Sequence, residues 1–128
     1  YGRGVTVQTS GMKVYNKQTG NLGEDFATSH LINKGFEIIK RNFSNKFGEL
    51  DIICKKDGLL IFVEVKTKIG DYFGTPEEMV GRGKLQRVRN MATMYMNGKL
   101  LPCRIDVIAV VLNPDNSLLR LTHYENVY

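Results

Sequence analysis

The sequence predicts a mixed α/β fold in which helices pack on one sheet, with elements in the order helix, three strands, helix, two strands. The first observation is the pair Asp57-Gly58 between two alternating apolar segments, a strong short-range signal for a β-hairpin. The second is a helical segment between that hairpin and another apolar strand, a connection that makes the flanking strands parallel. The third is the nearly continuous apolar character of the strand segments, which is typical of a sheet covered on both faces.

Length and charge limit the number of domains and the kind of partner that we expect. The chain has 128 residues, and we expect residues 12–128 to form a single domain. Residues 1–11 are polar, Gly-rich and without an initiating Met, so we interpret them as a leader added for expression or a flexible tail. Lys and Arg number 18 against 13 Asp and Glu, giving a net charge of +5 that suits an anionic partner such as nucleic acid.

Cysteine usage and hydropathy predict a soluble, cytoplasmic protein. Cys54 and Cys103 lie in predicted strands without CxxC or Cys/His spacing, and we expect both to be buried, reduced thiols. His30 and His123 are isolated in the sequence. No apolar run approaches the roughly 18 residues of a membrane span, and no signal-peptide pattern is present, so we expect no membrane partner.

A first helix is predicted at residues 17–34, because apolar residues recur there at helical spacing and Gly35 follows as a stop. Glu24 lies at the edge of the apolar face, an unusual position for a carboxylate. One interpretation is a capping box in which Asn21 is the N-cap and Glu24 reaches back to its amide. The other is that Glu24 supplies a third carboxylate to a metal site, which the strand motif described next favours.

Three strands are predicted before the second helix, at residues 36–43, 47–56 and 59–67. A turn between the first two strands is indicated by Asn42 and Asn45. If the hairpin between the second and third strands has a two-residue turn, Asp51 faces Glu64 and Glu49 faces Lys66. Side chains alternate between the faces of a strand, so these four project from one side of the sheet.

Carboxylates placed opposite each other repel, because directly opposed residues have Cβ atoms roughly 4.5–5.5 Å apart. A divalent cation would relieve the repulsion between Asp51 and Glu64, since Mg²⁺ binds through one or two carboxylates and keeps water and phosphate ligands. Lys66 would place an ammonium where it stabilises phosphate charge or helps deprotonate a water. The pattern favours metal-assisted phosphodiester hydrolysis. A plainer interpretation is that Glu64 and Lys66 belong to a solvated strand face, although their apolar neighbours argue against full exposure.

The second helical region is predicted to follow a Gly-containing loop at 68–75, with Thr75-Pro76 as N-cap and first helical residue. Gly81 and Gly83 predict a kink or a break before a segment at 84–97. Four basic residues crowd the start of this segment and are expected either to be solvated surface or to contact phosphates: Arg82, Lys84, Arg87 and Arg89.

The last two strands are predicted at 102–112 and 117–124, with the turn at 113–116 between them. The strand at 102–112 is almost wholly apolar, so it is expected to be buried. Because a helix connects it to the strand at 59–67, these two strands should run parallel.

Three motifs resemble, in order and spacing, the PD-(D/E)XK nuclease superfamily, whose fold is restriction-endonuclease-like: Gly23-Glu24, Gly48-Glu49-Leu50-Asp51 and Phe62-Val63-Glu64-Val65-Lys66-Thr67. Residues 12–128 resemble more closely the YraN-like family of small bacterial proteins that are predicted endonucleases. Further matches are Asn16-Lys17, Phe73-Gly74, Lys84 and Arg104-Ile105-Asp106-Val107. Leu50 stands where the superfamily nominally has Pro, a departure that many members share.

Carried over by position, the resemblance implies that Asp51 and Glu64 bind Mg²⁺ or Mn²⁺ and that Glu24 is the acidic residue of the first helix. It further implies that Lys66 is the catalytic lysine and, on a weaker match, that Lys84 is a basic group of the second helix. Relatedness to Holliday-junction resolvases within the superfamily suggests branched DNA by fold analogy alone.

The sequence is therefore compatible with two functions. The first is a metal-dependent endonuclease acting on DNA, in a linear, branched or otherwise structured form. The second is a non-catalytic nucleic-acid-binding or assembly module on the same fold, in which the charged residues serve as salt bridges. The joint presence of Glu24, Asp51, Glu64 and Lys66 favours the enzyme, and a homodimer and a monomer both remain open.

Overall fold

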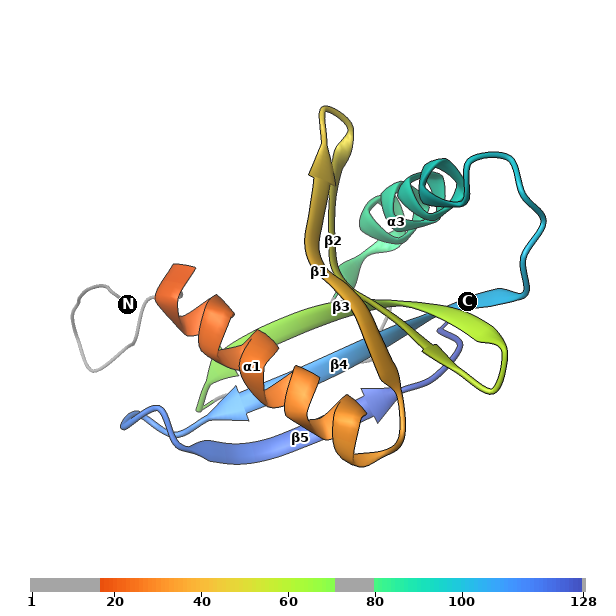
Figure 1. Cartoon of the computed structure of the whole chain (residues 1–128). Helices are drawn as coiled ribbons and strands as arrows, with labels where there is room; N and C mark the ends of the chain where they lie inside the picture. The colour runs from red at the N-terminus through yellow and green to blue at the C-terminus, as the bar shows by residue number, and fades with distance from the viewer. Residues whose placement is uncertain (1–16, 71–79, 128) are drawn as a thin grey trace.

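In the computed structural model, which describes residues 17–70 and 80–127, a mixed five-stranded sheet carries a helix on each face (Figure 1). The elements follow the predicted order. They are α1 (Lys17–Asn33), β1 (Glu37–Asn45), β2 (Gly48–Lys56), β3 (Leu59–Ile69), α3 (Arg82–Met96), β4 (Cys103–Leu112) and β5 (Leu118–Tyr124).

The strands lie side by side in chain order, β1-β2-β3-β4-β5. The pair β3 and β4 is parallel and all other pairs are antiparallel, as the helical connection between them predicts. The hairpin of β2 and β3 closes through a two-residue turn, because Lys56 pairs with Leu59. Asp57 and Gly58 have φ values of 53° and 77°, the left-handed conformation that a primed turn requires. The predicted register is confirmed over this paired part.

Two apolar cores cover the two faces of the sheet. Alternate residues of β3 divide between them, since Ile61 and Val63 pack with α1 while Leu60 and Phe62 pack with α3. The strands are apolar on both sides for this reason, and burial of these side chains is the main stabilising contribution. The prediction of a sheet covered on both faces is confirmed.

The β1–β2 hairpin bends away from the rest of the sheet, as Figure 1 shows at the upper end of both strands. Backbone pairing of β2 with β3 runs only as far as Ile52 and Val63. Beyond this point Leu50 packs in the core beside α3 although Ile52, two residues away, packs in the core beside α1. A register shift between Ile38 and Lys40 in β1 accompanies the bend. The bend opens a gap beside β3, in which the candidate site lies.

Several element boundaries differ from the sequence prediction. Asn42 does not mark a turn but lies within β1 with φ 55°, and the strand continues to Asn45. The turn is at residues 46–47, where the Asn45 side chain accepts a hydrogen bond from the Phe47 amide at 2.8 Å. Pairing with β4 extends β3 to Ile69, two residues into the predicted loop.

The predicted break before the second helical segment is confirmed. Gly81 is the N-cap of α3 with φ 81°, and the helix begins at Arg82, two residues earlier than predicted. Asn97 ends it in the left-handed conformation, followed by Gly98. The helix start predicted at 75–76 lies outside the described residues.

The two thiols occupy different environments. Cys54 is buried beside α1, as predicted, but Cys103 is exposed at the start of β4, where the expectation of a buried thiol is wrong. Within 17–70 and 80–127, no helix has the length and apolar character needed to cross a bilayer.

Candidate functional site

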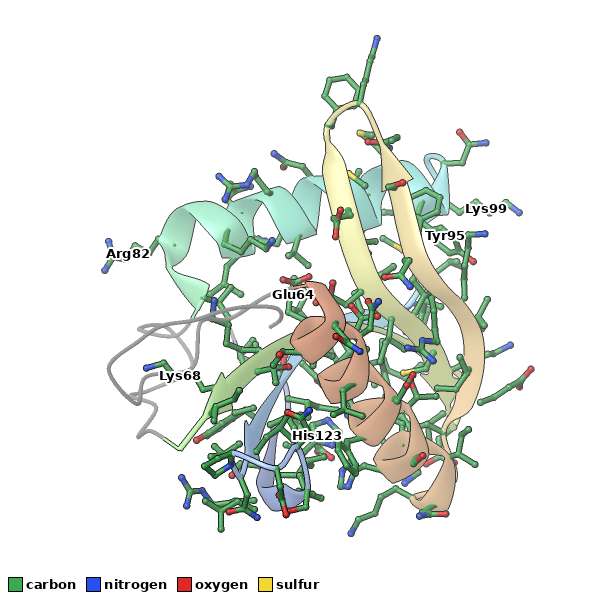
Figure 2. The ribbon with its side chains drawn as sticks, turned by 90° about the vertical axis from the view of Figure 1, so that its left-hand side faces the viewer. Glu64, Lys68, Arg82, Tyr95, Lys99 and His123 are labelled. Atoms are coloured by element: carbon green, nitrogen blue, oxygen red, sulfur yellow. The ribbon has the colours of Figure 1, made fainter. Side chains whose placement is uncertain are left out.

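A cleft of about 670 Å³ lies where β2 parts from β3, between α1 and the start of α3. It brings together all four residues predicted from the strand and helix motifs, which are Glu24, Asp51, Glu64 and Lys66. Figure 2 shows Glu64 between the two helices. The prediction that these side chains share one cleft is confirmed. The complete lining among the described residues is Gly20, Asn21, Glu24, Asn42, Ser44, Glu49, Asp51, Glu64, Val65, Lys66, Val80 and Lys84.

Asp51 is held at the point where the two strands separate. It follows the last backbone pair, and its carboxylate Oδ2 accepts a hydrogen bond from the Val65 amide at 2.8 Å. In a continued antiparallel ladder this amide would donate to a backbone oxygen of β2. The side chain thus replaces the backbone as acceptor and stays close to β3. Burial raises the pKa of Asp51, and the hydrogen bond from Val65 and the charge of Lys84 oppose that rise.

Glu64 is a buried carboxylate, with 5% of the residue exposed. Its Oε2 lies 3.5 Å from Nζ of Lys84 on α3. Burial and then the charge of Asp51 raise the pKa of Glu64 to about 8, against the opposing effect of Lys84. The two strand carboxylates therefore repel each other, as predicted. The predicted pairs Asp51/Glu64 and Glu49/Lys66 are not part of the backbone ladder, because pairing of β2 with β3 ends at Ile52 and Val63.

Glu24 reaches the same cleft from the other face of the sheet. Burial and then the charge of Asp51 raise the pKa of Glu24 to about 7, while Arg41 lowers it from 3.7 Å away. The capping-box interpretation is wrong, because α1 begins at Lys17 and Glu24 is well inside the helix. The carboxylate faces the cleft because Gly23 lets α1 approach β3, where a Cβ at that position would overlap the Thr67 side chain.

The four basic residues at the start of α3 do not form one cluster. At about 100° per residue, Lys84 and Arg87 lie on one flank of the buried stripe of α3, and Arg82 and Arg89 lie on the other. Lys84 lines the cleft. Figure 2 shows Arg82 directed outward, away from Glu64. Only one flank therefore adds positive charge beside the carboxylates.

The donor set fits a hydrated divalent cation. Buried oxygens Oε1 of Glu24 and Oε1 of Glu64 have no hydrogen-bond partner within the described part of the chain. The pKa values of all three carboxyl groups are raised mainly by burial and to a smaller extent by neighbouring carboxylates, and a cation bound among them would favour their ionised forms. Across 17–70 and 80–127, no group of three or more His, Cys, Asp or Glu is arranged as a preformed metal site. Mg²⁺ requires only one or two protein carboxylates and takes its remaining ligands from water and phosphate.

Sequence reasoning missed the contribution of β1 to the cleft, which consists of Asn42 and Ser44. Asn42 has φ 55° at the bend of the hairpin, and Asn is among the few residues that tolerate this conformation. The available signal was an Asn inside a strand, where Asn is depleted. Its proximity to Asn45 favoured a turn instead.

A second buried polar network lies away from the cleft, around Asp106. This residue is 0% exposed, and its carboxylate accepts hydrogen bonds from Arg104 at 2.9 Å and from the Asn126 amide at 2.9 Å, and contacts His123 at 2.8 Å. His123 in turn lies 3.1 Å from His30 of α1, so the two histidines are isolated in sequence only. Figure 2 shows His123 beside α1.

The charge of Asp106 is well compensated. Burial alone would raise its pKa, but the hydrogen bonds from His123, the Asn126 amide and Arg104 outweigh burial and hold the pKa of Asp106 below its usual value. This network joins α1 to β4 and β5. The pKa of Asp106 is thus lowered, whereas the pKa values of the carboxyl groups in the cleft are raised.

Comparisons with known proteins identify the family. Residues 23–110 match the model of the uncharacterised protein family UPF0102. A UPF0102 protein of Dictyoglomus turgidum is 39% identical over 116 residues, covering 88% of this chain and 98% of the relative. Similar proteins occur in Clostridium beijerinckii, with 39% identity over 91% of this chain and 98% of the relative, and in Corynebacterium efficiens, with 40% identity over 91% and 96%. The chain therefore belongs to the UPF0102 family.

Proposed function

We propose that the protein is a metal-dependent endonuclease of the PD-(D/E)XK type that hydrolyses phosphodiester bonds in DNA. The observation that carries the proposal is the convergence of three carboxyl groups with raised pKa, those of Glu24, Asp51 and Glu64, on one cleft that Lys66 also lines. Perturbed titratable groups gathered in a cleft are characteristic of functional sites. The net charge of +5 supports an anionic substrate.

The carboxylates would hold Mg²⁺ or Mn²⁺, with Asp51 and Glu64 as the main ligands and Glu24 facing them from α1. A cation held there would supply Lewis-acid chemistry, polarising a phosphate and making a water more acidic. The chain prepares this site by fixing Asp51 through the Val65 amide and by burying Glu64 against α3. Both carboxyl groups are thus held in position before a cation binds, and such preorganisation favours electrostatic catalysis.

The two lysines would act on the substrate phosphate. Lys66 lies on β3 two residues beyond Glu64, so both side chains leave the same face of the strand and enter the same cleft. Its ammonium would stabilise negative charge that grows on the phosphate oxygens. Lys84 pairs with Glu64 at 3.5 Å and is half exposed, so it can turn to a phosphate once another cation neutralises the carboxylate.

A non-catalytic nucleic-acid-binding or assembly module is the second candidate, and one observation favours it. Glu64 and Glu24 each have a cationic partner within the chain, Lys84 at 3.5 Å and Arg41 at 3.7 Å. In such a module these ion pairs would be the permanent state of the cleft. The enzyme hypothesis expects divalent cations to compete for the same carboxylates, so direct metal binding distinguishes the two functions.

A cleavage screen tests the enzyme hypothesis. Linear, single-stranded, flapped and four-way DNA would be incubated with Mg²⁺ or Mn²⁺ and either the wild type or Lys66→Ala. We expect divalent-dependent products from the wild type and a loss of about 100-fold or more in Lys66→Ala, the size of effect seen when one charge-stabilising group is removed. Equal activity of both proteins would assign the products to a contaminating nuclease.

Calorimetric titration with Mn²⁺ tests the metal site without relying on activity. The wild type should release or absorb heat on binding, and Asp51→Asn should bind at least tenfold more weakly because one of the two main anionic ligands is gone. Glu37→Gln, which removes a carboxylate from the exposed start of β1, is the matched control and should bind like the wild type. Identical titrations of wild type and Asp51→Asn would favour the non-catalytic module.

A further inference from the structure

The tip of the β1–β2 hairpin carries an exposed aromatic side chain. Phe47 lies in the two-residue turn between the strands and is 59% exposed. The ammonium of Lys46, the other turn residue, lies 5.3 Å from the centre of its ring. Figure 1 shows this tip projecting beyond the sheet beside α3. A large ring at such a position adds nothing to either core of the protein.

A groove of about 420 Å³ separates this ring from α3. Met91 and Met94 supply thioether side chains to it, and Arg87 and Asn90 supply polar groups. An aromatic ring, polarisable sulfur atoms and a guanidinium are the groups against which a nucleobase stacks. The full lining of the groove among the described residues is Phe47, Arg87, Asn90, Met91, Thr93 and Met94.

The groove is connected to the carboxylate cleft through β2 and α3. Phe47 precedes Asp51 by four residues of this extended hairpin strand, a separation of about 13 Å. On α3, Lys84 lines the cleft and Arg87, one turn later on the same flank, lines the groove. A strand whose phosphate lies in the cleft would therefore meet the groove within a few nucleotides.

We propose that this groove holds an unpaired base of the nucleic acid that the cleft binds, with Phe47 as the stacking surface. The inference rests on one part of the proposed function, namely that nucleic acid binds across the cleft. It does not require cleavage. Lys46 and Arg87 border the site with positive charge, which attracts a polynucleotide and opposes a second copy of the same surface. The substrate class implied is DNA with unpaired bases, such as a gap, a flap or a branch point.

Photocrosslinking and affinity measurements on the full chain in EDTA test the proposal. A gapped DNA with 5-iododeoxyuridine in the gap would be bound, irradiated and analysed by peptide mapping, and its affinity compared with that of a fully paired DNA. We expect the crosslink in the peptide that contains Phe47. Phe47→Ala should lose the crosslink and bind gapped DNA about tenfold more weakly, since stacking on one aromatic ring carries an effect of this size.

Matched variants keep the experiment decisive. Phe47→Tyr preserves a stacking ring and should bind gapped DNA within about twofold of the wild type. Leu100→Ala removes a fully exposed apolar side chain in the connection after α3 and should behave as the wild type. A crosslink elsewhere, unchanged gapped-DNA affinity in Phe47→Ala, or equal weakening on fully paired DNA would overturn the proposal. Because EDTA prevents cleavage, this experiment measures stacking independently of catalysis. A crosslink at Phe47 together with no divalent-dependent cleavage in the Mg²⁺ and Mn²⁺ screen described above would refute the enzyme and leave this inference standing.

Discussion

Glu64 occupies a strand position whose neighbours are apolar, and in the folded protein it is 5% exposed. A buried ionised carboxylate is unfavourable unless cations and hydrogen bonds compensate its charge. Lys84 compensates it from 3.5 Å, while Asp51 adds a like charge. Protonation is therefore the easiest way for the metal-free protein to relieve this position, and the pKa of Glu64 rises to about 8.

This shift predicts how stability depends on pH in the metal-free protein. The folded-state pKa of Glu64 lies above its unfolded value, so its stabilising effect is fully present below about pH 4.5 and is lost as the pH rises through about 8. Between pH 5.5 and pH 8.5 the free energy of unfolding should fall by roughly 2–4 kcal/mol more in the wild type than in Glu64→Gln. Urea titrations in EDTA measure this difference.

The control for that measurement is Glu37→Gln, which removes a carboxylate at the exposed start of β1. It should keep the pH dependence of the wild type, because Glu37 lies outside the cleft. A pH dependence in Glu64→Gln that is as steep as in the wild type would mean that Glu64 is not the group held protonated by its surroundings.

Some contacts of single residues could be predicted from the sequence and others could not. Glu24, Asp51, Glu64 and Lys66 could be selected because alternation along a strand and spacing along a helix are local properties. The contact between His30 and His123 could not, because these residues are 93 positions apart in the chain. Nothing local to either histidine indicates that Asp106 lies behind it.

At the scale of elements, the position of α1 depends on one glycine. Gly23 lies so close to β3 that a Cβ would overlap the hydroxyl and methyl groups of Thr67. The next residue of the helix is Glu24, so the close packing that Gly23 permits also brings the carboxylate into the cleft. Packing and site geometry are thus set by the same two neighbouring residues.

We expect Gly23→Ala to destabilise the protein by about 1–3 kcal/mol, because overpacking forces a shift of the helix or the strand. Removal of the Thr67 hydroxyl and methyl groups in Gly23→Ala/Thr67→Ala should restore part of that loss. Gly83→Ala in α3 is the matched control. Its new Cβ would meet only the end of Arg87 at 3.7 Å, and helix propensity should make it neutral or stabilising by up to about 1 kcal/mol.

Urea denaturation of the four proteins checks this prediction. If Gly23→Ala were as stable as the wild type, α1 would not depend on this close approach. Equal stability of the single and the double variant would instead show that Thr67 is not the obstacle.

The hairpin shows which properties of an element are encoded locally. Asp57-Gly58 determines the turn, and the turn determines the register of β2 and β3, so this part could be predicted. The bend of the β1–β2 hairpin depends on the register shift at Ile38/Lys40 and on packing of Leu50 against α3. These are tertiary effects, and they decide that the two strands separate at Asp51.

For the whole molecule, that separation allows helices on opposite faces of the sheet to reach one site. α1 contributes Glu24 from one face and α3 contributes Lys84 from the other, while β2 and β3 supply the carboxylates between them. Element order and strand direction follow from the sequence pattern. The sequence pattern does not predict that residues from both faces of the sheet meet at the gap, because an unbroken sheet would keep them apart.

The distribution of positive charge over the molecule gives the last prediction. Lys84 and Arg87 lie on the flank of α3 that lines the cleft and the groove, whereas Arg82 and Arg89 lie on the other flank. Each phosphate that a protein neutralises contributes about −0.9 to the slope of log affinity against log salt. Lys84→Ala/Arg87→Ala should therefore reduce the magnitude of this slope by about 1–2, where the upper value requires Lys84 to exchange Glu64 for a phosphate.

Arg82→Ala/Arg89→Ala removes the same formal charge and is the matched comparison, for which we expect a clearly smaller change in slope. Fluorescence anisotropy on gapped DNA in EDTA, at several salt concentrations, gives the three slopes. Arg87→Ala alone leaves the ion pair of Lys84 with Glu64 in place and should produce at least half of the double-variant effect. Equal changes in slope for the two pairs would mean that the charge acts through the whole surface, and DNA would then not be confined to the flank that joins the cleft and the groove.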